Sequence, residues 1–233
     1  MKKLIGYIFP VIVLFSSCSS FYTSNSHNIP LIKAYNESTI NANAGLNGLD
    51  IQGATAIDHH LSIMGNFSYS TSGRDSAAGN HHQHLMGELA IGHFGHLTME
   101  TTYEIFAGYG LGYYQAYNQF DFFGPYNTLA RGQFNRYFLQ GNFGRKIDNI
   151  EFGGALKTSY FNMFEIKSQD VTIRESYNSI FLEPAVFARF DLQKLQLTTQ
   201  LGYSYDVSNN FQLSQQSLIF SVGVMYKIKR YYY

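Results

Sequence analysis

The charged side chains of this sequence fall mainly at every second position of segments that otherwise hold bulky apolar residues. In residues 98–117, for example, Glu100 and Glu104 alternate with Met99 and Tyr103. A period of two places the charged and the apolar side chains on opposite faces of a β-strand. If the strands close on themselves, the charges share an interior in which opposite charges must pair. We therefore expect a lumen charge network of Asp50, Glu88, Glu100, Glu104, Arg136, Glu151, Lys157, Glu183 and Arg189.

Two functions are compatible with this network. In a small barrel the inward side chains nearly fill the interior, so the charges would form a salt-bridged plug that fixes the barrel. The alternative is a narrow polar pore for small solutes. Gly108, Gly110 and Gly112 could leave room for such a pore, or they could serve only to allow curvature.

Histidines form a second candidate site. His81, His82 and His84 lie close together after a polar segment, and neutral imidazoles suit Zn, Cu or Ni. They have no cysteine or carboxylate partner at a fixed spacing, although strand packing could bring Asp75 near them. We therefore expect no metal site and no cofactor.

The same region contains residue types used in nucleophilic catalysis. Asp75, Ser76 and the histidines at 81–84 could serve an outer-rim hydrolase or acyl transferase. The sequence lacks the Gly-x-Ser-x-Gly elbow, and no triad spacing can be recognised. We therefore expect no enzyme but a structural or binding protein, with the loops 118–130 and 167–177 as contact surfaces. The catalytic hypothesis is kept as an alternative.

The strand pattern indicates how these residues are positioned. Residues 98–117 carry an apolar face over a height that suits a membrane, and a second face of carboxylates and glycines. A soluble sandwich would send its polar face to water and would have shorter strands. The pattern predicts an all-β fold, an antiparallel up-and-down transmembrane β-barrel with lipid outside and a polar lumen inside.

The composition agrees with a barrel. Charged residues make up 14% of the 233 residues and aromatic residues 17%, whereas about a quarter of a typical soluble protein is charged. Outside the N-terminus, no apolar run approaches the roughly 20 residues that a spanning helix needs. The formal net charge of +0 gives no reason to expect nucleic acid as a partner.

Turn signals divide the barrel region, residues 37–230, into about ten strands. Asn47-Gly48 is a hairpin signal of type I′. After that first hairpin, short and long connections alternate, as periplasmic turns and extracellular loops do in outer-membrane barrels. Both termini are then expected on the periplasmic side. Eight strands is the alternative, if the first hairpin lies outside the wall.

The N-terminus has the pattern of a targeting segment. Lys2 and Lys3 precede a short apolar run and small residues, which is typical of a secretory signal peptide. Residues 1–17 resemble a bacterial lipoprotein signal, with the one cysteine of the chain, Cys18, at the expected cleavage and lipidation point. Ordinary cleavage beside an incidental cysteine is the alternative. Residues 18–36, rich in Ser and Asn, are expected to form a lipidated tether.

Two stretches resemble outer-membrane families. Ser221, Gly223, Tyr226 and Ile228 match the polar-x-Gly-x-x-aromatic-x-hydrophobic pattern that the barrel-assembly machinery reads on a last strand. Residues 30–70, with a Pro-Leu start, an Asn-rich hairpin and an Asp-His turn, resemble small lipoprotein-type barrel proteins of the Bacteroidetes. The resemblance implies an outer-membrane location, with outer-membrane lipid and the barrel-assembly machinery as partners. It supports fold and location only.

Overall fold

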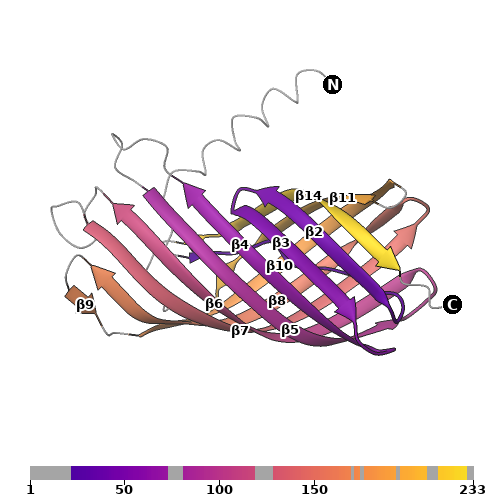
Figure 1. The fold of residues 1–233 in the computed structure, drawn as a ribbon, viewed down its shortest axis with the longest axis horizontal. Helices are drawn as coiled ribbons and strands as arrows, with labels where there is room; N and C mark the ends of the chain where they lie inside the picture. Colours follow the sequence, from indigo (N-terminus) through magenta and orange to yellow (C-terminus); the bar gives the residue numbers. More distant parts are fainter. Residues whose placement is uncertain are drawn as a thin grey trace, which may run out of the picture.

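In the computed structural model, the alternating segments form one closed antiparallel barrel (Figure 1). The structure describes residues 22–72, 81–118, 128–168, 171–173, 176–192, 195–208 and 215–229. The wall consists of β2 (Glu37–Gly45), β3 (Gly48–Ala56), β4 (Leu61–Ser72), β5 (His81–His96), β6 (Thr101–Asn118), β7 (Thr128–Ile147), β8 (Ile150–Ser168), β10 (Tyr177–Leu192), β11 (Leu195–Tyr203) and β14 (Leu218–Lys229).

Each wall strand pairs with the next one along the chain, and β14 pairs with β2 to close the sheet. The predicted all-β, up-and-down barrel of about ten strands is confirmed. The eight-strand alternative is wrong, because β2 and β3 pair within the wall.

The connections differ in length between the two ends of the barrel. The turns of residues 57–60, 97–100 and 148–149 lie at one end, which we call the short-turn end; β2 begins and β14 ends there. The opposite, long-loop end carries the β4–β5, β6–β7, β8–β10 and β11–β14 connections, together with the β2–β3 turn. Among the described residues, no helix has the length and apolarity to cross a membrane.

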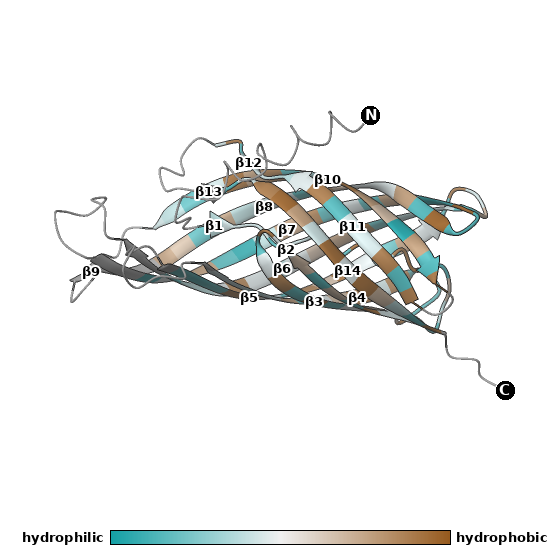
Figure 2. Ribbon diagram, turned by 90° about the horizontal axis from the view of Figure 1, so that it is seen from above, coloured by the Kyte–Doolittle hydropathy of each residue, from teal (hydrophilic) through white to brown (hydrophobic). Residues whose placement is uncertain are grey.

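Four short strands lie at the long-loop end. β9 (Val171–Ile173) pairs with β8, and β12 (Tyr205–Asp206) pairs with β10, so both extend the wall. β1 (Tyr22–Thr23) and β13 (Gln215–Gln216) pair in parallel and form a separate two-stranded sheet. Since β13 belongs to the β11–β14 connection, this pairing holds the first described residues toward the long-loop end (Figure 2).

The wall has an apolar outside and a buried inside, and hydropathy alternates along its strands (Figure 2). Leu89 is 74% exposed, whereas the preceding residue, Glu88, is 3% exposed. The same alternation recurs around the barrel, and it follows from the two-residue period of a strand. Outward apolar residues include Ile40, Ile51, Phe67, Ile105, Leu111, Leu139, Leu156, Val186, Leu201 and Val222.

The glycines of β6 make room for side chains of the neighbouring strand. Gly108 is the cross-strand partner of Phe138, and Gly112 that of Phe134. A Cβ atom would lie 2.4 Å from the Phe138 ring at Gly108, and 2.1 Å from the Phe134 ring at Gly112. The rings of Phe134 and Phe138 therefore occupy the space that Gly112 and Gly108 could have left for a pore.

The interior is layered rather than uniformly polar. An apolar cluster that includes Tyr114 and Phe134 lies toward the long-loop end. A second cluster, which includes Phe106 and Phe138, lies toward the short-turn end. The charged side chains lie mainly between these clusters and beside the second one. Phe106 and Phe138 are apolar residues at inward positions that are otherwise polar or small. Their rings pack in the interior of the barrel.

Much of the described part of the predicted tether, residues 22–32, lies inside the barrel. Residues 22–32 are all buried, and the chain emerges only over residues 33–36 before β2 begins. Leu31 is fully buried with a φ of 48°, and its side chain occupies the space that a Cβ atom on Gly144 would need. We call residues 22–33 the lumen segment.

Because of the lumen segment, the first and last described residues lie at different ends of the barrel. Tyr22 lies at the long-loop end, whereas Lys229, the last residue of β14, lies at the short-turn end. The described chain therefore starts and finishes at opposite ends of the barrel, whereas the two termini, for which the sequence predicted one common side, lie outside the described residues. The described ends differ because the chain crosses the lumen once before it enters the wall.

Candidate functional site

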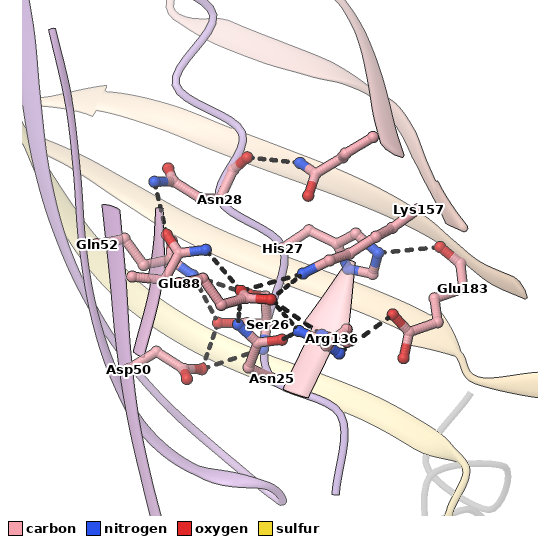
Figure 3. A network of polar contacts seen from close by, with 12 residues as sticks. Asn25, Ser26, His27, Asn28, Asp50, Gln52, Glu88, Arg136, Lys157 and Glu183 are labelled. Atoms are coloured by element: carbon pink, nitrogen blue, oxygen red, sulfur yellow. Dashed lines mark hydrogen bonds and ion pairs between the residues drawn. The ribbon is translucent and has the colours of Figure 1, made fainter. Parts of the chain in front are cut away.

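A cluster of four charged residues from four wall strands lies at the centre of the lumen (Figure 3). Glu88 of β5 accepts hydrogen bonds from Arg136 Nε at 3.0 Å and from Lys157 Nζ at 3.0 and 3.1 Å. Arg136 Nη1 lies 3.6 Å from a carboxylate oxygen of Glu183. All four side chains are at most 1% exposed. The two anions and two cations balance, which offsets the cost of burying each charge.

The lumen segment completes the hydrogen bonding of this cluster. Asn25 Nδ2 donates to Glu88 at 2.8 Å, and Arg136 Nη2 donates to Asn25 Oδ1 at 2.7 Å. The hydroxyl of Tyr22 donates to Glu183 at 2.9 Å and accepts from Arg136 at 2.6 Å. Residues of the segment therefore lie within hydrogen-bond distance of both carboxylates.

A second charge cluster surrounds Glu151 near the short-turn end. The carboxylate of Glu151 lies 2.9 Å from Lys33 Nζ, 3.3 Å from Arg189 Nη1 and 3.6 Å from Lys227 Nζ. Arg189 also donates to the backbone carbonyl of Ile29. One buried carboxylate thus joins the lumen segment to β8, β10 and β14.

Asp50 and Glu104 bind the backbone of the lumen segment. Asp50 accepts a hydrogen bond from the N–H of Ser26 at 3.1 Å, and a second one from the Ser26 hydroxyl. Glu104 accepts from the N–H of Ile32 at 2.9 Å and from Asn142 at 2.9 Å. Charge-assisted bonds of this kind are among the stronger hydrogen bonds in proteins.

Glu100 does not face the lumen, so the prediction that it belongs to the lumen charge network was wrong. It lies in the turn of residues 97–100, where strand alternation no longer sets its direction. Its carboxylate lies 3.2 Å from Arg145, and both side chains are more than half exposed. The other predicted network residues are buried inside the barrel. They form two charge clusters and two carboxylates that bind the backbone of the lumen segment. Hydrogen bonds through Asn66, Asn28 and Asn142 link Glu88 to Glu104.

The remaining candidates are only partly within the described chain. His82 and His84 face the lumen, are buried, and have ring centroids 5.5 Å apart. Cys18, Asp75 and Ser76 lie outside the described residues, as does the side chain of His81. Within the described part of the chain, no group of three or more His, Cys, Asp or Glu residues could hold a metal ion.

The lumen segment is the part of the site that the sequence did not reveal. Its contacts reach nine wall strands, β2 to β8, β10 and β11. Most of them come from backbone groups and from Asn, Ser and His side chains that are typical of a linker. His27 is an example: its N–H donates to Gln200 at 2.8 Å, and its ring bonds to the carbonyl of Glu183 at 2.9 Å. The one signal was the excess of acids over bases among the predicted inward residues, since the extra carboxylates need donors from elsewhere.

Comparisons with known proteins give only fold-level likenesses. No family model matches the chain, and no curated protein matches it significantly. The solved structures similar to it include the outer membrane protease OmpT from Escherichia coli, with 14% identity over 82% of this chain and 93% of that one and a TM-score of 0.47. The translocator domain of the autotransporter NalP from Neisseria meningitidis has 8% identity, over 84% and 86%, with a TM-score of 0.43.

The toluene transporter TodX from P. putida is a further similar structure, with 9% identity over 91% of this chain and 71% of that one and a TM-score of 0.36. These identities and scores are too low for the activity of any of these proteins to be transferred to this chain.

Proposed function

We propose that the protein is an outer-membrane β-barrel closed by its own lumen segment, with a structural or binding role and no catalytic activity. The observation that carries the proposal is the path of residues 22–33. The segment contacts the wall at successive levels, from Tyr22 beside Glu183 to Lys33 beside Glu151. The residues of the segment between Tyr22 and Lys33 are all buried inside the barrel.

The membrane location is supported by the outer surface. Outward apolar side chains recur on every wall strand, and a soluble protein rarely exposes an apolar surface of this extent. A water-soluble barrel would have the opposite arrangement, with polar groups outside and an apolar interior. An apolar outer band around a partly polar interior is typical of a barrel in lipid.

A pore for small solutes is the second candidate, and two features disfavour it. Phe134 and Phe138 fill the space opposite the β6 glycines, and the lumen segment occupies the axis. A hydrolase or acyl transferase is the third candidate. His82 and His84, its only described candidate side chains, lie at the start of β5 near the long-loop end, where both are buried and face the lumen.

Planar-bilayer recording tests the closed barrel. The full chain is expected to give no conductance steps above background. A variant that lacks residues 24–32 is expected to give steps, provided that it still shifts on a gel between heated and unheated samples. Steps from the full chain at the same protein concentration would overturn the proposal. Hydrolysis of a lipid or peptide by the full chain, lost in His82→Ala, would overturn the non-catalytic role.

A further inference from the structure

The lumen segment crosses the barrel in one direction. At the long-loop end, the carbonyl of Ser24 accepts a hydrogen bond from Asn47 in the β2–β3 turn at 2.6 Å. Midway, Asn28 Nδ2 donates to the carbonyl of Gly53 at 3.1 Å. At the short-turn end, the N–H of Lys33 donates to Glu37, the first residue of β2, at 2.9 Å.

The same contacts show how far the segment travels. Ser24 lies beside the turn that follows β2, and Lys33 lies beside the residue that begins β2, so the segment runs the whole length of that strand. Nine strand residues correspond to about 30 Å. The carbonyl of Lys33 also contacts His96 Nε2 at 2.8 Å, at the end of β5. The segment therefore passes from one rim of β2 to the other.

Chain length limits where the residues before Tyr22 can go. Cys18 precedes Tyr22 by four residues, which span at most about 14 Å when fully extended. A return to the short-turn end would need about 30 Å through a lumen that the segment already occupies. A path over the rim and down the outside would have to cross the hydrocarbon layer, which is also about 30 Å thick. Neither path is within reach.

We infer that the N-terminus of the processed chain is displayed at the long-loop end, on the cell-surface side of the outer membrane. The inference rests on the proposed outer-membrane location, with long loops outside as in other such barrels. It holds whether the signal is removed at Cys18 or a few residues later. If Cys18 carries acyl chains, they insert into the outer leaflet, and not into the inner leaflet as a periplasmic tether would require.

Thiol labelling of intact cells tests this inference. Ser20→Cys adds a thiol two residues before Tyr22, and the parent chain reports any labelling of Cys18 itself. A membrane-impermeant maleimide should label Ser20→Cys on intact cells as strongly as Val207→Cys, which lies exposed in the β11–β14 connection. Asn149→Cys, which is exposed in a turn at the opposite end, should be labelled only after the outer membrane is permeabilised.

The outcomes separate the two proposals. Labelling of Ser20→Cys only after permeabilisation, beside surface labelling of Val207→Cys, would overturn the inference and leave the outer-membrane barrel intact. Surface labelling of Asn149→Cys with protection of Val207→Cys would reverse the orientation and overturn the inference as well. Equal labelling of Val207→Cys and Asn149→Cys in intact cells would overturn both proposals, because the barrel would then not separate two compartments. Heat-dependent gel mobility checks that each variant is folded.

Discussion

Arg136 and Glu88 form a buried ion pair across a strand that lies between them. Glu88 belongs to β5 and Arg136 to β7, and Gly110 of β6 is in register with both. Because Gly110 has no side chain, the two charged groups meet over it. A Cβ atom at Gly110 would lie 2.9 Å from Cγ of Glu88. The ion pair therefore depends on a glycine that takes no part in it.

Replacement of Glu88 tests the contribution of the central cluster. Glu88→Gln leaves Arg136 and Lys157 buried, with Glu183 as the only nearby anion among the described residues. Removing one partner of a buried pair typically costs about 3–5 kcal/mol. We expect a loss of this size in the free energy of unfolding, measured by urea titration of the folded protein in detergent.

Glu100→Gln is the matched control for this substitution. It removes the same charge from a pair that is more than half exposed, and such pairs contribute about 0–1 kcal/mol. An equal loss in both variants would mean that the central cluster adds no more stability than a surface pair.

Substitution of Gly110 tests whether the Glu88–Arg136 ion pair requires a residue without a side chain at this position. Gly110→Val would push a side chain against Glu88 and separate the two charges. Overpacking of this kind costs about 1–3 kcal/mol, so unfolding should occur at a lower urea concentration. Gly141→Val on β7 is the control, since a Cβ atom there meets nothing within 4 Å. If Gly141→Val were as destabilising as Gly110→Val, the effect would come from strand conformation and not from the pair.

The wall and most of the inward charges could be predicted from the sequence because strand alternation fixes the direction of each side chain. Glu100 shows the limit, since it lies one residue before β6 begins. The lumen segment could not be predicted because it has no period. Its interactions come from amide, hydroxyl and backbone groups, as between Ser26 and Asp50, and such groups are equally common in a solvated linker.

The Glu151 cluster should respond unequally to loss of its members. Glu151→Gln removes the one carboxylate that pairs with Lys33, Arg189 and Lys227, so we expect a loss of about 3 kcal/mol or more in the free energy of unfolding. Lys33→Met leaves Glu151 with two cations and removes a side chain that is 25% exposed. Its cost should stay below about 1 kcal/mol. The same urea titration measures both, and a larger effect of Lys33→Met would contradict the shared role of Glu151.

The outward tyrosine of the last strand provides a test of assembly that is separate from stability. Tyr226 lies on the outward face of β14, opposite Ile40 of β2 at the closing seam. We propose that the barrel-assembly machinery recognises this position. Tyr226→Ala should then lower the heat-modifiable fraction in cells, whereas refolding of the purified variant in detergent should match that of the parent chain. Tyr203→Ala removes a similarly exposed tyrosine from neighbouring β11 and should leave the assembled fraction unchanged. If both variants lost the same assembled fraction, the defect would reflect lost lipid contact and not recognition of the last strand.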